Sequence, residues 1–130
     1  MKYLLDTDTV SYALRGEGQV AEHITAHKPS ELCVSAISLA ELRYGADRKG
    51  SRRLHALVDT FVAAVEVVGF GKQAALEFGR IGTILAERGT PIGEFDVLIA
   101  AHAASLRCTL VTNNLRHFSK VPGLVLENWK

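Results

Sequence analysis

Three acidic residues stand where carboxylates could do chemistry rather than only solvate a surface. Asp6 directly follows the apolar run 3–5, Glu41 lies within a helical pattern, and Asp96 opens a long apolar segment. In open α/β sheets, ligands bind just beyond the carboxyl ends of the strands. Carboxylates that converge there repel one another unless a cation lies between them. Oxygen ligands without His or Cys would favour a hard ion, Mg²⁺ or Mn²⁺.

Each of these acids also has an ordinary structural explanation. Asp6 could cap the helix that follows it, and Glu41 could complete a capping box with Ser38. Asp96 could compensate the dipole at the start of its helix, although the residues around it are apolar. The same dipole role, on an exposed surface, is expected for Glu94. These alternatives stay open for any one acid taken alone.

Short apolar runs alternate with helical patterns along the chain, which predicts how the acids are positioned. Strands are expected over residues 3–5, 32–34, 65–68, 109–112 and 124–126. Helices are expected over 7–14, 19–27, 37–46, 54–64, 72–88 and 94–106, with a basic loop over 48–53. This alternation predicts a three-layer α/β/α sandwich with a mostly parallel five-stranded sheet, formed by residues 1–130 as a single domain.

The charge balance and the hydropathy of the chain exclude several classes of function. The chain carries 15 basic and 14 acidic residues, for a net charge of +1, so a surface that is basic throughout is excluded. No apolar run is long enough to span a membrane, and no secretory leader is visible, which favours the cytoplasm. Cys33 and Cys108 lie in apolar runs and are expected to be buried free thiols. Among the five histidines only His23 and His27 have a helical i, i+4 spacing, with no Glu between them to act as a base, and all five are expected at the surface.

Four motifs, spread along the chain in order, resemble those of a known family. They are Leu4-Leu5-Asp6-Thr7, Ser38-Leu39-Ala40-Glu41-Leu42-Arg43-Tyr44-Gly45, Ile92-Gly93-Glu94-Phe95-Asp96-Val97-Leu98-Ile99-Ala100-Ala101-His102-Ala103 and Leu110-Val111-Thr112-Asn113-Asn114. Together they resemble PIN-domain ribonucleases, and most closely the VapC toxins of type II toxin–antitoxin modules. Each motif alone is weak, whereas the ordered set is specific.

The resemblance implies a fold, an activity and partners. The fold would be a Rossmann-like PIN sandwich, and the activity Mg²⁺-dependent cleavage of RNA, often tRNA, with Mn²⁺ as a substitute ion. Water activated by the metal would attack the phosphodiester in line and leave a 5′-phosphate and a 3′-hydroxyl. The implied partners are a second copy of the chain and a VapB-like antitoxin, with DNA contacted only through that antitoxin.

The resemblance also carries roles onto particular residues. Asp6, Glu41 and Asp96 would be the metal-site acids. Asn114 stands where many PIN proteins have a fourth acid, and an amide adds no charge, which puts a tightly held second ion in doubt. Thr112 and Asn114 would have supporting polar roles. Basic residues near these motifs could hold the RNA backbone: Arg43, Arg48, Lys49, Arg52, Arg53 and Arg116.

Three other functions compete with the nuclease. A phospho-acceptor receiver domain also places acids around Mg²⁺, but it needs an acceptor Asp after a central strand and a Lys after a later one. The third expected strand here ends in Val68-Gly69 and the fourth in Thr112-Asn113. A metal-free ribonuclease that uses histidine acid–base chemistry would survive EDTA and leave a cyclic phosphate. A non-catalytic RNA- or protein-binding module would tolerate Asp96→Asn.

Overall fold

Five parallel strands form one sheet, in the order β3-β2-β1-β4-β5, in the computed structural model, which describes residues 1–130. The strands are β1 (Tyr3–Leu5), β2 (Leu32–Ser35), β3 (Glu66–Val68), β4 (Thr109–Val111) and β5 (Leu126–Glu127). The central strand β1 pairs with β2 on one side and with β4 on the other. The chain order therefore reverses beside β1, and ligands of open α/β sheets bind at such a switch point.

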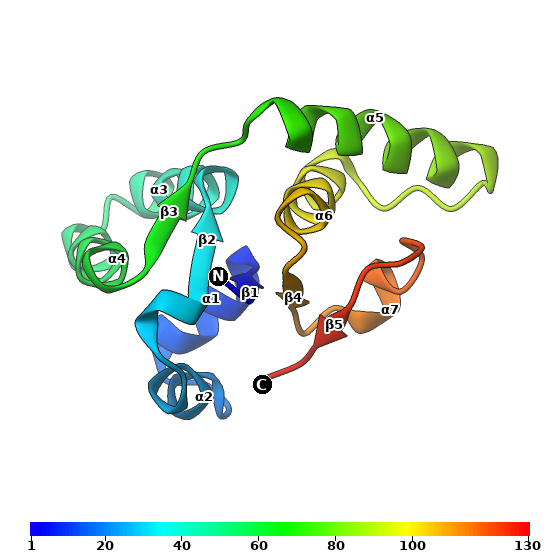
Figure 1. Cartoon of the computed structure of the whole chain (residues 1–130). Helices are drawn as coiled ribbons and strands as arrows, with labels where there is room; N and C mark the ends of the chain where they lie inside the picture. Colours follow the sequence, from blue (N-terminus) through cyan, green and yellow to red (C-terminus); the bar gives the residue numbers. More distant parts are fainter.

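Seven helices cover the two faces of this sheet (Figure 1). They are α1 (Thr7–Arg15), α2 (Val20–Ala26), α3 (Ala36–Lys49), α4 (Arg52–Ala64), α5 (Lys72–Glu87), α6 (Glu94–Leu106) and α7 (Leu115–Phe118), with a 3₁₀ turn (Pro29–Glu31) before β2. Helices α5 and α6 lie on one side of the sheet, and α1 and α2 on the other (Figure 1). The predicted three-layer sandwich is confirmed, and its sheet is entirely parallel.

Two hydrophobic cores, one on each face, hold the layers together. Successive residues of a strand point to opposite faces. Accordingly, Leu4 packs with Ile81 of α5 in one core, while Leu5 packs with Val10 of α1 and Val58 of α4 in the other. Because β1 is buried on both faces, its sequence is apolar without a polar break. That burial fixes the position of Asp6 at its end.

Three local predictions are corrected by the structure. The expected basic loop over 48–53 is wrong: α3 continues to Lys49, and α4 begins at Arg52. Between them Gly50 adopts a left-handed conformation (φ 59°), which ends α3 in a tight turn. The fifth strand lies at Leu126–Glu127 rather than over 124–126, and the short helix α7 was not expected at all.

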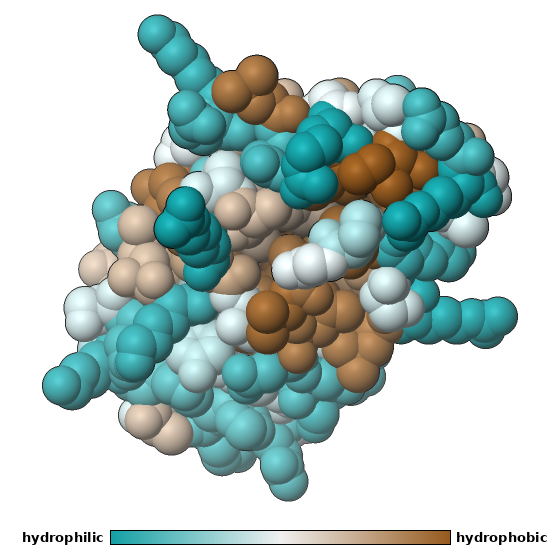
Figure 2. Space-filling view, turned by 45° about the vertical axis from the view of Figure 1, so that its right-hand side comes forward, coloured by the Kyte–Doolittle hydropathy of each residue, from teal (hydrophilic) through white to brown (hydrophobic).

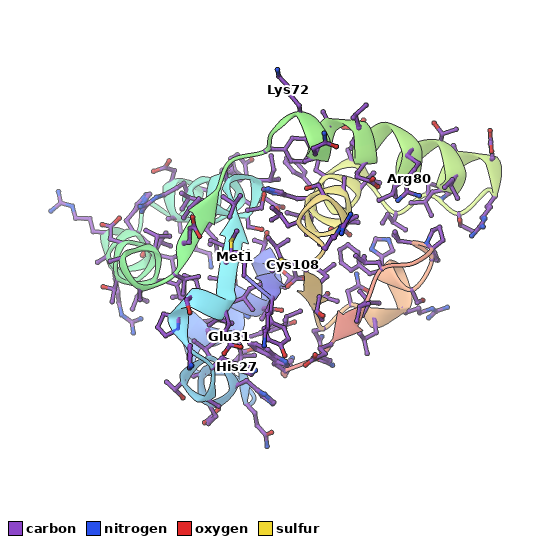
Figure 3. The ribbon with its side chains drawn as sticks, viewed as in Figure 1. Met1, His27, Glu31, Lys72, Arg80 and Cys108 are labelled. Carbon is purple, nitrogen blue, oxygen red and sulfur yellow. The ribbon has the colours of Figure 1, made fainter.

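The prediction for the cysteines is confirmed, and the prediction of surface histidines is wrong for His102. Cys33 and Cys108 are both buried free thiols, and Figure 3 places Cys108 in the interior near the sheet. His102 is only 1% exposed, with Nδ1 2.7 Å from Ser35 Oγ, and burial lowers its pKa. His23 and His27 stack on the buried indole of Trp129. An apolar helix can bury a histidine because a hydroxyl partner satisfies the ring nitrogen.

The face of the molecule shown in Figure 2 is largely hydrophilic, with apolar side chains gathered in patches between the polar ones. The large apolar side chains that are exposed are Met1, Tyr44, Leu76, Phe95, Leu115 and Val125. None of the helices combines the length and the apolar character that crossing a membrane requires.

Candidate active site

Asp6 both caps a helix and faces the candidate site. Its Oδ1 accepts a hydrogen bond from the Thr9 backbone N–H at 2.8 Å, which makes it the N-cap of α1. The Thr112 hydroxyl, at the end of β4, also bonds to this carboxylate. The side chain is almost fully buried. Burial raises the pKa of Asp6, and the hydrogen bonds from the two threonines partly offset that rise.

Glu41 lies in the middle of α3 and is not part of a capping box. The N-cap of α3 is Ser35, whose Oγ accepts from a backbone N–H of the first turn. Glu41 is therefore free to point away from its own helix end. Its Oε1 accepts a hydrogen bond of 2.7 Å from the hydroxyl of Thr7, the first residue of α1.

The charge environment of Glu41 indicates that carboxylates gather around it. Burial is the largest cause of its raised pKa. The Thr7 hydrogen bond lowers the pKa in part, whereas the negative charges of Asp96, Asp8 and Asp6 raise it further. Repulsion of this kind requires the acids to be near neighbours in space, although they lie far apart in the chain.

Asp96 lies in the first turn of α6 and faces the short helix α7. Its Oδ2 lies 2.8 Å from Nδ1 of His117, which has no other polar partner. Burial raises the pKa of Asp96, while the charge and hydrogen bonding of His117 lower it in part. The neighbouring acid Glu94 is exposed on the same turn, as expected.

One small pocket of about 90 Å³ collects these acids. Its lining comes from the junction of β1 and α1, from the middle of α3 and from the first turns of α6: Asp6, Thr7, Asp8, Glu41, Asp96 and Ile99. The predicted convergence of Asp6, Glu41 and Asp96 is therefore present. An all-oxygen donor set whose carboxyl pKa values are raised suits a hard divalent cation, because the cation relieves the repulsion.

The carboxylates line one pocket but do not close around a single point. No three side chains among the Asp, Glu, His and Cys residues form a group close enough to hold an ion. Instead each acid has its own partner: Asp6 is held by Thr9 and Thr112, Glu41 by Thr7, and Asp96 by His117. Binding of an ion would therefore require side-chain rotations within the pocket.

Thr112 and Asn114 differ in how they relate to this pocket. Thr112 is fully buried, bonds to Asp6, and accepts a 2.9 Å hydrogen bond from the Asn114 backbone N–H. The Asn114 side chain is exposed and does not line the pocket. Thr112 therefore orients a site acid, while the supporting role of Asn114 stays a prediction.

The basic residues named from the sequence fall into two groups. Arg43 is engaged between α3 and α4, where it pairs with Asp59 and contacts His55. The others are exposed: Arg48, Lys49, Arg52, Arg53 and Arg116. Of these, Lys49 lines a groove beside the acid pocket, together with Arg15, Thr7 and Glu41.

Sequence reasoning did not place four residues in contact with the acid site: Thr7, Asp8, Arg15 and His117, the last considered only as a contact for the RNA backbone. Thr7 and Asp8 follow Asp6 directly, so their adjacency to a strand end was an available signal. Arg15 ends α1 on the groove that Lys49 lines. No signal in the sequence indicated the contact of His117 with Asp96, because that contact depends on the placement of the unexpected helix α7.

Comparison with known proteins identifies the family. The PIN domain model matches residues 3–124. The tRNA(fMet)-specific endonuclease VapC of Salmonella typhimurium is 39% identical, over 99% of this chain and 98% of its own length. Ribonuclease VapC2 of Rickettsia felis is 35% identical over the same shares of the two chains.

Solved structures of VapBC complexes have the same fold as this chain. The DNA-bound VapBC of Salmonella typhimurium matches with a TM-score of 0.94 and 38% identity, over 100% of this chain and 99% of that one. VapBC2 of Rickettsia felis, bound to a fragment of its promoter, matches with a TM-score of 0.90 and 32% identity over 100% of both chains. The chain therefore belongs to the PIN domain family and, within it, to the VapC ribonucleases.

Proposed function

We propose that this chain is a Mg²⁺-dependent endoribonuclease toxin, in which Mn²⁺ can replace Mg²⁺. One observation carries the proposal: Asp6, Glu41 and Asp96, from three separate elements, line one pocket, and all three have raised pKa values. Structural acids that only cap helices have no reason to share a pocket. A divalent ion offsets their repulsion and makes the pocket attractive to a phosphodiester.

The residues of the chain divide the work of this site. Asp6, Glu41 and Asp96 would hold the ion, which supplies charge neutralisation at the phosphate and acidifies water. Thr112 orients Asp6 and Thr7 orients Glu41 through their hydroxyls. The exposed cations would contact RNA phosphates around the pocket. Asn114, at the end of β4, would contact substrate or water through its amide.

The proposed partners follow from the names of similar proteins. A relative at 39% identity is named as an endonuclease specific for tRNA(fMet), which makes tRNA the first RNA class to test. Similar structures are VapBC complexes, two of them bound to DNA. We therefore propose neutralisation by a VapB-like antitoxin, a homodimeric toxin, and contact with DNA only through the antitoxin.

The direct test is cleavage of total tRNA by the purified chain. We expect cleavage with Mg²⁺ or Mn²⁺, none in EDTA, and products that carry a 5′-phosphate and a 3′-hydroxyl. Asp96→Asn and Glu41→Gln should each abolish cleavage. Glu94→Gln is the matched control: it removes an exposed acid from the same turn as Asp96 and should retain full activity.

Two results would contradict the proposal. Cleavage that persists in EDTA and leaves a cyclic phosphate would indicate metal-free histidine chemistry. RNA binding without cleavage, unaffected by Asp96→Asn, would indicate a non-catalytic binding module. The receiver alternative has lost its support, because the match to the PIN domain model spans residues 3–124.

A further inference from the structure

Three grooves of different chemical character meet at Glu41. This residue lines the acid pocket together with Asp6 and Asp96. It also lines the groove that contains Arg15 and Lys49. On a third side it borders a groove whose other walls are Ala40, Tyr44 and Phe95. A chain bound across the acid pocket can therefore extend into a basic groove and into an aromatic one.

The aromatic groove exposes two large aromatic rings to solvent. Tyr44 of α3 is 67% exposed, and Phe95 of α6 is 57% exposed. The groove has a volume of about 580 Å³, which a planar ring system can enter. Exposed apolar surface next to a polar site is a common mark of a binding site. The position beside Glu41 ties this surface to the acid pocket.

Charge decides which part of a ribonucleotide suits each groove. The aromatic groove holds no cation, and its only charged residue is Glu41, so a phosphate there would be repelled. The groove with Arg15 and Lys49 offers cations for phosphates. An uncharged, flat nucleobase matches the aromatic groove, because every base can stack on an aromatic side chain.

We infer that Tyr44 and Phe95 form a subsite for one unpaired base next to the cleaved phosphodiester, while Arg15 and Lys49 hold backbone phosphates on the other side of Glu41. This inference rests on the proposed ribonuclease function. It assigns the direction in which the RNA chain crosses the acid pocket. It makes single-stranded or looped RNA the substrate class, because a base within a duplex cannot enter such a groove. Tyr44 and Phe95 are substrate-binding residues in this arrangement.

The test compares variants on an RNA oligonucleotide whose cleaved bond has been mapped with the parent chain. Tyr44→Ala and Phe95→Ala should each lower kcat/KM about 5- to 150-fold, as expected for loss of stacking by one base. The loss should fall mainly on KM, because the base is bound equally in the ground and transition states. Tyr44→Phe keeps the ring and should be nearly unchanged, whereas Tyr44→Leu should lose activity like Tyr44→Ala.

An abasic substrate makes the assignment specific. Removing the base on one side of the cleaved bond should weaken cleavage by the parent chain by a similar factor. The same change should have little further effect on Tyr44→Ala, because the two changes remove one interaction. Leu76→Ala, which truncates another apolar side chain that is 67% exposed, should leave cleavage unchanged.

The outcomes separate this inference from the proposed function. If the parent chain cleaves no RNA, the proposed function fails. If it cleaves RNA and the Tyr44→Ala and Phe95→Ala variants match it, the base subsite is overturned. Variants that cleave normally but no longer bind the antitoxin would make the groove a protein-docking surface. Variants that cleave normally but dissociate from dimer to monomer would make it an interface between copies, and either result overturns the inference.

Discussion

His117 Nδ1 lies 2.8 Å from Oδ2 of Asp96, one of the acids that line the pocket. The two residues belong to different helices, α7 and α6, and α7 comprises only four residues. The contact places an imidazole ring opposite one of the carboxylates of the site. It also gives Asp96 a partner other than an ion.

Removal of His117 should raise the pKa of Asp96. Burial already raises this pKa, and the interaction with His117 lowers it in part. In His117→Ala only the raising causes remain, so the carboxyl should titrate at higher pH than in the parent chain. The measurement is an NMR titration of the Asp96 side chain in EDTA. His55→Ala, which removes a histidine paired with Asp47 instead, should leave the titration of Asp96 unchanged. A titration midpoint that falls in His117→Ala would contradict the assigned contact.

Glu41→Gln should stabilise the metal-free chain at neutral and alkaline pH. Because the pKa of Glu41 is raised in the folded chain, the unfolded chain releases this proton first. Its ionisation therefore lowers the free energy of unfolding as the pH rises from the unfolded value of about 4.3 through the folded pKa. Below the unfolded value both states are protonated, so the advantage of the variant should vanish there.

Thermal melts in EDTA across this pH range measure the effect. Addition of Mg²⁺ should raise the melting temperature of the parent chain, because the ion binds only the folded state. The difference in melting temperature between the parent chain and Glu41→Gln should then shrink or change sign. Glu94→Gln is the control and should follow the parent chain at every pH. A Glu41→Gln variant that melts clearly below the parent in alkaline EDTA would show that the acids do not repel one another.

Much of this site could be predicted from the sequence because two of its three acids, Asp6 and Asp96, sit at element boundaries. Asp6 ends an apolar run, and Asp96 opens a helix whose bounds, 94–106, match the expected ones. Because these elements are buried, their sequences are apolar, and an acidic residue within or beside them stands out. Glu41 was found because Ala40 and Tyr44 share its helical face, and the same face forms the aromatic groove.

What the sequence did not predict depends on tertiary placement. Arg48 and Arg52 looked like parts of one basic loop, yet Gly50 turns the chain sharply enough for both flanking segments to stay helical. His102 was expected at the surface, since nothing local shows that Ser35 would meet it in the core. The contact between His117 and Asp96 likewise joins elements whose approach no local pattern encodes.

Trp129 should stabilise the fold from the far end of the chain. Its indole is 3% exposed and stacks on His27 at 4.7 Å and on His23 at 5.3 Å between ring centroids. Tyr3 of β1 lies 5.1 Å away, so the tryptophan ties the chain end to the central strand. Truncation of a buried aromatic side chain to Ala costs about 3–5 kcal/mol.

Urea unfolding followed by far-UV circular dichroism measures this cost, because the chain has only one tryptophan and the variant loses its fluorescence. Trp129→Phe keeps a ring and should lose less than Trp129→Ala. Leu76→Ala, at an exposed position, should change stability by no more than about 0.5 kcal/mol. A Trp129→Ala variant as stable as the parent chain would place the C-terminal residues outside the cooperative fold.

Lys49 should contribute more to RNA binding than Arg53, although both are exposed cations close together in sequence. Lys49 lines the groove beside Glu41, whereas Arg53 lines none of the grooves that meet there. A cation that contacts a phosphate of single-stranded RNA contributes about 0.7 to the slope of log affinity against log salt. In the cleavage-deficient Asp96→Asn background, Lys49→Ala should reduce this slope by about that amount, measured by fluorescence anisotropy over a salt series. Arg53→Ala is the matched control and should lower affinity only slightly, with the slope unchanged. Equal changes in slope for the two variants would mean that RNA follows the whole basic surface of α3 and α4 rather than the groove beside the acids.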